Sequence, residues 1–283
     1  MFFTPLLQGA ASSGTGRLVC VNSGKPRNSQ PSRPTQIDRS NPLTLGLVKA
    51  INAATLDRSV TLAGSAPTPM QLTTPIGIGL SAKGATSYYV ASPTALASLN
   101  PTWTILTIVS NFTGSAGGGG YGLYVERPNS TQIIKIVVGM NLTFSNAEFT
   151  TRDLSSNLVQ MRPSYTSGGG PNVSDGRPHV MAFTRRASND HRGWIDGREV
   201  VSNTATNISG AFAATNATIG IDLFDTLTFN GAVPLVLVWN RSLSDKELAS
   251  ISRNPWQVLR LILASSLSVY RYYRCGNAIT YAV

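Results

Sequence analysis

The chain has 283 residues, of which 42% are hydrophobic and 13% are charged. The charged share is about half that of an average soluble protein, and Thr, Ser, Asn and Gly are abundant. This composition excludes a disordered polyelectrolyte and is typical of many short strands joined by small polar turns. The formal net charge is +10, which is compatible with an acidic partner or with a role in solubility alone.

Several classes of function are disfavoured by residues that are missing. The basic residues are scattered along most of the chain and do not form the aromatic-plus-basic signature of a single-strand binder, so no specific nucleic acid is expected as a partner. Only two histidines, His179 and His191, and two cysteines, Cys20 and Cys275, are present, without a C-x-x-C pair, which argues against a structural zinc site. The apolar run at 261–270 is too short to cross a bilayer as a helix, so no membrane partner is expected.

Residues 1–40 are predicted to form an extended basic arm. Pro26, Pro31 and Pro34 lie among Ser and Asn residues, a composition with little capacity to form a core of its own. The arm is either a disordered leader or a segment that becomes ordered against a neighbouring molecule. The apolar residues at 1–7 favour the second alternative, because they would be costly to leave in water. The candidate partner-docking residues of the arm are Arg17, Lys25, Arg27, Arg33 and Arg39.

Three β-branched runs then predict the centre of a β-sheet structure. They are Trp103–Val109, Gln132–Val138 and Val233–Trp239, and each carries apolar residues at both odd and even positions. Strands alternate their side chains between two faces, so apolar residues on both faces predict strands that are covered on both sides.

A hairpin and a single helix follow in the second half. Asp196-Gly197 lies between two strand-like runs and is typical of a two-residue hairpin turn. Ser244-Asp-Lys-Glu247 forms a capping box, with Leu243 and Leu248 placed as a hydrophobic staple, and Asn254-Pro255 ends the predicted helix. Strands followed by one helix are not the alternation of a parallel βαβ sheet.

The order of these segments resembles the concanavalin A-like, laminin-G-type jelly roll. The resemblance rests on Arg177-Pro-His-Val-Met-Ala-Phe-Thr184, on Gly193-Trp-Ile-Asp-Gly197, and on Val236–Trp239 followed by Asn240–Leu248. It implies an all-β sandwich of two antiparallel sheets with one short C-terminal helix, over residues 41–256. Trp194 stands where the family usually has Tyr. Residues 257–283 would be a C-terminal tail, in which 266–274 alternates like an edge strand.

Two short sequence segments, one at each end of the domain, make the resemblance more specific. Asn41-Pro-Leu-Thr-Leu-Gly-Leu-Val48 and Ser252-Arg-Asn-Pro-Trp-Gln257 are similar to those around such domains in structural proteins of tailed bacteriophages. The resemblance implies a decoration, head-fibre or tail-associated subunit located in the virion. Assembly of such a particle in the host cytoplasm would agree with a start at 1–9 that does not look like a secretory signal.

Catalysis is not expected. Glycoside hydrolases share this architecture, but they need two carboxylates placed across the sugar, and the acidic residues of the chain are dispersed. His179 is interpreted as a strand residue with a satisfied ring and His191 as an exposed residue of the turn 188–192, and neither has an evident base-and-orienter partner.

No cofactor is expected, although calcium is common in the wider family. Asp222 and Asp225 are the candidate metal ligands, with an ordinary Asx-type turn as the alternative.

Two main hypotheses remain open at this point. The first is a non-enzymatic structural subunit of a bacteriophage virion, whose partners are its own copies and other virion proteins such as the major capsid protein. The second is a lectin-like module that binds host glycans through exposed residues at one rim. For that role the candidates are Trp194, Tyr121, Asp190, His191 and Arg192. A secreted eukaryotic adhesion domain is a third hypothesis, which glycosylation of native material would support.

Overall fold

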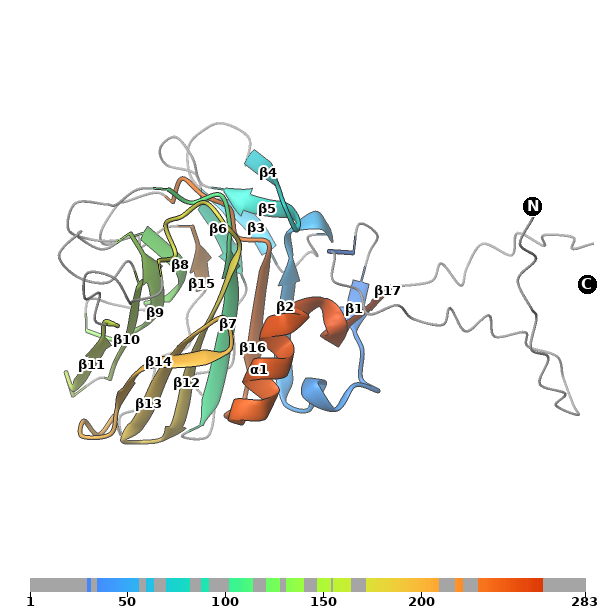
Figure 1. Ribbon diagram of the computed structural model, residues 1–283. Helices are drawn as coiled ribbons and strands as arrows, with labels where there is room; N and C mark the ends of the chain where they lie inside the picture. The colour runs from blue at the N-terminus through green and yellow to red at the C-terminus, as the bar shows by residue number, and fades with distance from the viewer. Residues whose placement is uncertain are drawn as a thin grey trace, which may run out of the picture.

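The fold is an antiparallel two-sheet sandwich with one α-helix, as a computed structural model shows (Figure 1). The predicted all-β jelly-roll class is therefore confirmed. The structure describes residues 30–31, 35–55, 60–63, 70–81, 88–91, 102–113, 121–127, 131–139, 147–153, 155–163, 172–208, 217–220 and 229–261.

The larger sheet has seven strands. In spatial order they are β11 (Leu158–Met161), β10 (Ala147–Arg152), β9 (Ile133–Val138), β8 (Tyr121–Glu126), β15 (Ala217–Ile219), β6 (Tyr88–Ala91) and β3 (Val60–Ala63).

The second sheet has six strands. In spatial order they are β14 (Arg198–Asn203), β13 (Asp190–Ile195), β12 (His179–Ala187), β7 (Trp103–Val109), β16 (Leu235–Trp239) and β2 (Leu47–Asn52). A separate hairpin pairs β4 (Met70–Thr74) with β5 (Gly77–Ser81), and short 3-10 turns at Pro42–Thr44 and Ala53–Thr55 flank β2.

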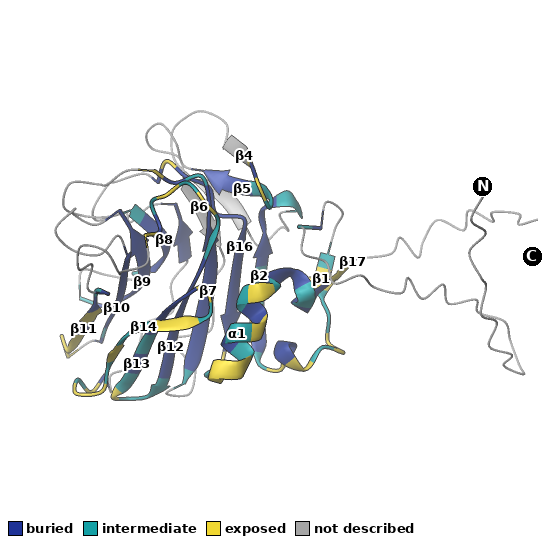
Figure 2. Ribbon diagram, viewed as in Figure 1, coloured by how far each residue is buried: buried dark blue, intermediate teal, exposed yellow. Residues whose placement is uncertain are grey.

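The main core lies between the two large sheets. Trp103 and Phe183 of the six-stranded sheet meet edge to face at 4.8 Å between ring centroids, and Phe183 lies 5.8 Å from Phe149 of the seven-stranded sheet. The isoleucines at 134 and 136 of β9 belong to the same buried cluster. These contacts fix the two pleated layers against each other, and Figure 2 shows the buried strands of both sheets in dark blue.

A second apolar cluster lies on the outer face of the six-stranded sheet. Leu106 of β7 and Leu237 of β16 point to that face, and they pack with Leu248 and Ile251 of helix α1 (Asp245–Arg253). Trp256, in the 3-10 turn Pro255–Val258, belongs to the same cluster. The central strands are thus covered on both sides, as their apolar runs predict.

Helix α1 has the predicted start and end. Ser244 is its N-cap, Glu247 completes the capping box, and Asn254 is the C-cap. Thr104 Oγ1 on β7 accepts a hydrogen bond of 2.9 Å from the Leu243 backbone N–H, so the sheet also fixes the segment that enters the helix. Leu243 and Leu248 are both fully buried.

The predicted hairpin turn is also present and rests on this helix. Asp196 and Gly197 have φ values of 51° and 78°, the left-handed conformation that a twisted two-residue hairpin requires. Asp196 Oδ1 accepts a hydrogen bond of 2.8 Å from the Val180 N–H. A Cβ atom at Gly197 would lie 3.1 Å from the Cα atom of Ala249 in α1, so the turn and the helix are in close contact.

The two ends of the described fold meet in a small sheet. β1 (Thr35–Ile37) pairs antiparallel with β17 (Leu259–Leu261), and Thr35 lies opposite Leu261. β1 belongs to the predicted arm and β17 to the predicted tail, so these two regions join each other at the domain surface (Figure 1). In the part of the chain that the structure describes, no helix is long and apolar enough to span a membrane.

Candidate functional site

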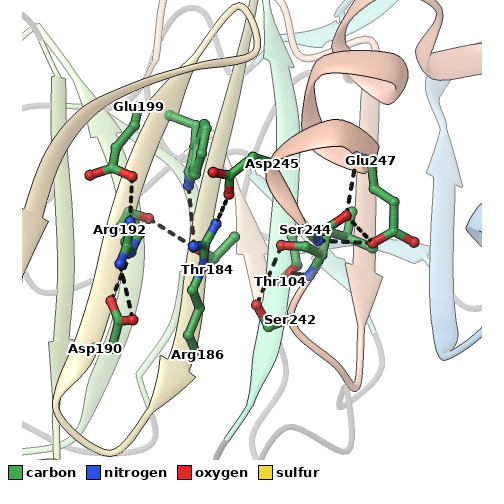
Figure 3. Close-up of polar contacts among 12 residues, drawn as sticks. Thr104, Thr184, Arg186, Asp190, Arg192, Glu199, Ser242, Ser244, Asp245 and Glu247 are labelled. Carbon is green, nitrogen blue, oxygen red and sulfur yellow. Dashed lines mark hydrogen bonds and ion pairs between the residues drawn. The ribbon is translucent and has the colours of Figure 1, made fainter.

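Charged side chains gather on the outer face of β12–β14, beside the start of α1 (Figure 3). We call this group the ionic shelf. It consists of Arg186 on β12, Asp190 and Arg192 on β13, Glu199 on β14 and Asp245 at the first position of α1. All five side chains are partly accessible to solvent. The shelf contains two ion-paired groups, Asp190–Arg192–Glu199 and Arg186–Asp245.

Arg192 is the centre of the shelf. Its Nε and Nη2 atoms donate to the two carboxylate oxygens of Asp190 at 2.9 and 3.3 Å, and its Nη1 atom donates to Glu199 Oε2 at 2.8 Å. These hydrogen bonds, first that of Asp190 and then that of Glu199, raise the pKa of the Arg192 guanidinium. The guanidinium lies between two carboxylates, so the hydrogen bonds fix the orientation of all three side chains.

Arg186 extends the shelf to the helix. It forms an ion pair with Asp245, and its guanidinium carbon lies 5.5 Å from the centre of the Trp194 ring. The Trp194 indole N–H donates to Thr184 Oγ1 at 3.3 Å. Arg186 therefore covers the indole while it connects the sheet to the first turn of α1, where a carboxylate is also favoured by the helix dipole.

A β-bulge brings Glu199 to the shelf. Gly193 pairs with Val201, but Trp194 pairs with Glu199, so one extra residue, Val200, stands in β14. Val200 and Val201 both pack against the core between the sheets. The shift returns Glu199 to the outer face beside Arg192, whereas a regular ladder would place Val200 opposite Trp194.

The predicted glycan-binding residues are only partly brought together. Asp190 and Arg192 are adjacent on the shelf. Trp194 lies on the same face of the strand, but it is only 4% exposed, so its predicted exposure is wrong. The reason is tertiary: α1 and Arg186 cover the ring, which belongs to the outer apolar cluster.

The prediction that His191 is exposed is also wrong. β13 begins at Asp190, so alternation directs His191 into the core, where it is fully buried and its ring centroid lies 6.4 Å from that of Phe183. Both ring nitrogens lack a hydrogen-bond partner. Burial, and then the charge of Arg185, lower the pKa of His191 to about 4. The imidazole is thus an uncharged core group and faces away from the shelf.

Tyr121 does not contribute to the shelf either. It belongs to β8 in the other sheet and is half-buried against Phe112 and Phe229, at 5.5 and 6.3 Å between ring centroids. Arg39 is exposed and donates to the Leu47 carbonyl at 3.1 Å. The remaining predicted docking and metal residues lie outside the described residues: Arg17, Lys25, Arg27, Arg33, Asp222 and Asp225. Within the described ranges, no group of three potential metal ligands occurs.

Two other polar groups have structural roles. His179 Nδ1 lies 2.8 Å from Asp196 Oδ2 and His179 Nε2 lies 2.9 Å from Asp175 Oδ1, which confirms a strand histidine with a satisfied ring. On the seven-stranded sheet, the Glu148 carboxylate is fully buried and accepts hydrogen bonds from Thr150, Gln160 and Arg162 at 2.6, 3.0 and 2.7 Å. Lys135 Nζ lies 3.9 Å from the same carboxylate. Its oxygens are satisfied by the protein itself.

Comparison with solved structures places the fold among β-sandwich domains. The chain is similar to domain 4 of an extracellular GH43 arabinanase from Geobacillus stearothermophilus, solved in complex with arabinotriose. That likeness has a TM-score of 0.55 and 15% identity and covers 73% of this chain and 98% of that one.

The chain is also similar to botulinum neurotoxin type C, whose cell entry depends on interaction with two ganglioside molecules. The TM-score is 0.57, the identity is 14%, and the likeness covers 74% of this chain and 51% of that one. The neurotoxin DC binding domain in complex with SialylT gives a TM-score of 0.54 at 12% identity and covers 74% and 51%.

The chain spans about half the length of these neurotoxin structures. Neither a protein-family model nor a curated protein matches the sequence. At these identities the likenesses show the fold alone, a β-sandwich.

Proposed function

We propose that this protein is a lectin-like module that binds glycans, and that the ionic shelf is the binding surface. The observation that carries the proposal is the Asp190–Arg192–Glu199 arrangement, in which a guanidinium and two carboxylates are fixed by mutual hydrogen bonds of 2.8–3.3 Å on a solvent-accessible sheet face. The structural neighbours that contain arabinotriose or depend on gangliosides support this class of ligand.

The shelf has the chemistry that a polyhydroxylated ligand needs. Carboxylate oxygens accept hydrogen bonds from sugar hydroxyl groups, and guanidinium N–H groups donate to sugar oxygens. Because β13, β14 and α1 hold these groups in place before a ligand arrives, little side-chain entropy is lost on binding. The arrangement thus combines directional polar groups with a rigid support.

We further propose that the shelf binds without catalysis. A glycoside hydrolase needs open space between its two carboxylates for the sugar, whereas Asp190 and Glu199 both contact the guanidinium of Arg192. The shelf also contains no Ser or Cys nucleophile paired with a base.

A glycan array with matched variants tests this function. Arg192→Ala removes the central group and is expected to lower glycan binding by about tenfold or more, as for loss of a charge-assisted hydrogen-bond pair. Arg198→Ala is the control, because Arg198 is an exposed cation on the same hairpin that forms no ion pair with the shelf. Unfolding midpoints of both variants show that the fold is retained. No binding by the wild type, or equal binding by both variants, contradicts the proposal.

A second candidate function is a structural subunit of a bacteriophage virion that docks through its ends. The observation that favours it is the β1–β17 pairing, which places Thr35 and Leu261, the residues next to the segments 1–34 and 262–283, opposite each other. These segments carry four and two cations and no acid, so they hold six of the ten net positive charges. The proposed partners are its own copies and other virion proteins such as the major capsid protein.

Deletion of residues 1–29 tests the virion hypothesis, and it leaves β1 and the hydrogen bonds of Gln30 to Asn52 and Ile78 intact. The shortened chain is expected to fold but to be absent from purified particles. Normal incorporation of the shortened chain contradicts docking through the arm.

A further inference from the structure

The ionic shelf has a net negative charge, whereas the chain as a whole has a net positive charge. The shelf contains three carboxylates and two guanidiniums. Arg192 is paired with Asp190 and Glu199, and Arg186 is paired with Asp245. Both cations are thus already neutralised, and one negative charge remains in excess, whereas the whole chain has a net charge of +10.

The hydrogen-bonding capacity that remains on the shelf is rich in acceptors. Each carboxylate oxygen can accept two hydrogen bonds. Glu199 accepts only at Oε2 and Asp245 only at Oδ1, so Glu199 Oε1 and Asp245 Oδ2 accept no hydrogen bond from the described residues. Arg192 uses three of its five N–H groups, which leaves two donors beside these acceptors.

The neighbouring cations do not change this balance. Arg198 lies opposite Ile195, a residue of the core between the sheets, so its side chain leaves β14 on the other face from Glu199. Arg185, next to Arg186, points to the other face of β12 and is buried, with its Nη2 atom donating to the Ile208 carbonyl. Lys246 is an exposed cation at the helix end of the shelf, so an anionic group that approached Arg192 and Glu199 would meet no unpaired guanidinium there.

From these contacts we infer that the shelf selects uncharged saccharides and discriminates against sialylated or uronate-bearing ones. This inference rests on the proposed glycan-binding function. Hydroxyl groups of a neutral sugar donate to the open oxygens of Glu199 and Asp245 and accept from the remaining Arg192 N–H groups. A sugar carboxylate in the same place would instead stand against the excess negative charge, and close like-charge contacts weaken binding strongly.

The test is an array of matched glycan pairs that differ only in a terminal sialic acid, for example lactose and 3′-sialyllactose, with arabinotriose as a further neutral probe. The array is read at about 0.15 M and about 0.5 M NaCl, because salt screens attraction to the basic terminal segments but not a neutral contact. The neutral member of a pair is expected to bind about tenfold or more tightly, and its binding is expected to be the same at both salt concentrations.

Glu199→Gln tests whether the shelf causes the selectivity. It removes one negative charge while it keeps the side-chain shape, so the ratio of the affinity for the neutral glycan to that for the sialylated glycan is expected to fall several-fold. Asp38→Asn is the matched control, because Asp38 lies next to β1 and its carboxylate accepts hydrogen bonds from Ser40, and it should leave the preference unchanged.

The outcomes separate the two proposals. Tighter binding of sialylated glycans that depends on Arg192 overturns the inference about charge and leaves glycan binding standing. A neutral preference that Glu199→Gln does not alter overturns the assignment to the shelf. Absence of binding to every glycan overturns the proposed function itself.

Discussion

Glu126 is a carboxyl group that the sandwich holds in its interior. It lies on β8 opposite the core residue Ile134, is only 5% exposed, and accepts a hydrogen bond from the Tyr124 hydroxyl. Burial raises the pKa of Glu126 to about 8, although the hydrogen bond of Tyr124 and the charge of Lys49 act in the opposite direction. The folded protein therefore keeps this group protonated at neutral pH.

The first prediction concerns this residue. Between pH 4.5 and about 8 the folded state binds a proton that the unfolded state has lost, so stability falls as pH rises through this window. Glu126→Gln is expected to remove that dependence and to stabilise the protein at pH 8 by on the order of a few kcal/mol. Urea unfolding at pH 5 and pH 8 measures the free energy of unfolding of the wild type and the variant. If wild type and variant lose stability in parallel over this range, the carboxyl is not a neutral core group.

At the scale of single residues, sequence alone could not place His191 and Trp194 correctly. The polar composition of residues 188–192 predicts a turn, but β13 begins at Asp190, and a strand start that differs by one or two residues decides which face each side chain occupies. Burial of Trp194 depends on α1, about fifty residues away in sequence. Asp190 and Arg192 were selected as polar residues of that predicted turn, and they share one face because they lie two residues apart on β13.

At the scale of elements, the β13–β14 hairpin and helix α1 support each other through the contact at Gly197. The turn needs a positive φ at this position, and the backbone of Ala249 lies close to it. The same hairpin carries Arg192 and Glu199, and the same helix carries Asp245. The Gly197 contact therefore holds together the two elements that support the shelf.

The second prediction tests that contact. Gly197→Ala is expected to destabilise the protein by about 2–4 kcal/mol, because it combines the cost of a positive φ with a clash against the helix. Gly176→Ala is the control: its φ of 81° is similar to the 78° of Gly197, but the nearest atom to an added Cβ is a Thr113 methyl group at 3.3 Å. Urea unfolding compares the two, and equal losses would mean that the helix adapts freely to the turn.

Elements with local signals were predictable, and those that depend on irregular pairing were not. The capping box of Ser244 and Glu247 and the turn at Asp196-Gly197 depend on a few consecutive residues, and both are present as predicted. Glu199 was missed as a site residue because the β-bulge at Val200 leaves no mark in the sequence. Asp245 was recognised only as part of a helix start, since its partner Arg186 is fifty-nine residues away.

At the scale of the whole molecule, net positive charge is concentrated toward the two ends of the sequence. Residues 35–261 hold four of the ten net positive charges, and the two terminal segments hold the other six. The acidic side of the charge balance therefore belongs to the sandwich and its shelf. Salt would weaken binding through the ends, which depends on cations, but would leave binding of neutral glycans by the shelf unchanged.

The third prediction concerns the limits of the folded unit. A chain of residues 30–261 is expected to unfold within about 3 °C of the full chain, because it keeps both large sheets, the β1–β17 pair and the hydrogen bonds of Gln30 to Asn52 and Ile78. A chain of residues 30–258 loses that pair and the burial of Leu259, and its midpoint is expected to fall by about 5 °C. Calorimetry measures both. If the two shortened chains melt together, the small sheet adds nothing to the fold.

The position of Thr35 opposite Leu261 also determines how the protein responds to mechanical load. Thr35 and Leu261 form the outer rung of an antiparallel pair, so tension between these two residues acts across the hydrogen bonds of β1 and β17 one rung at a time. Such a peeling geometry yields at low force, because no two rungs share the load. Stretching a molecule anchored at both ends would load this three-residue pair and the hydrogen bonds of Gln30 to β5 before the sandwich behind them.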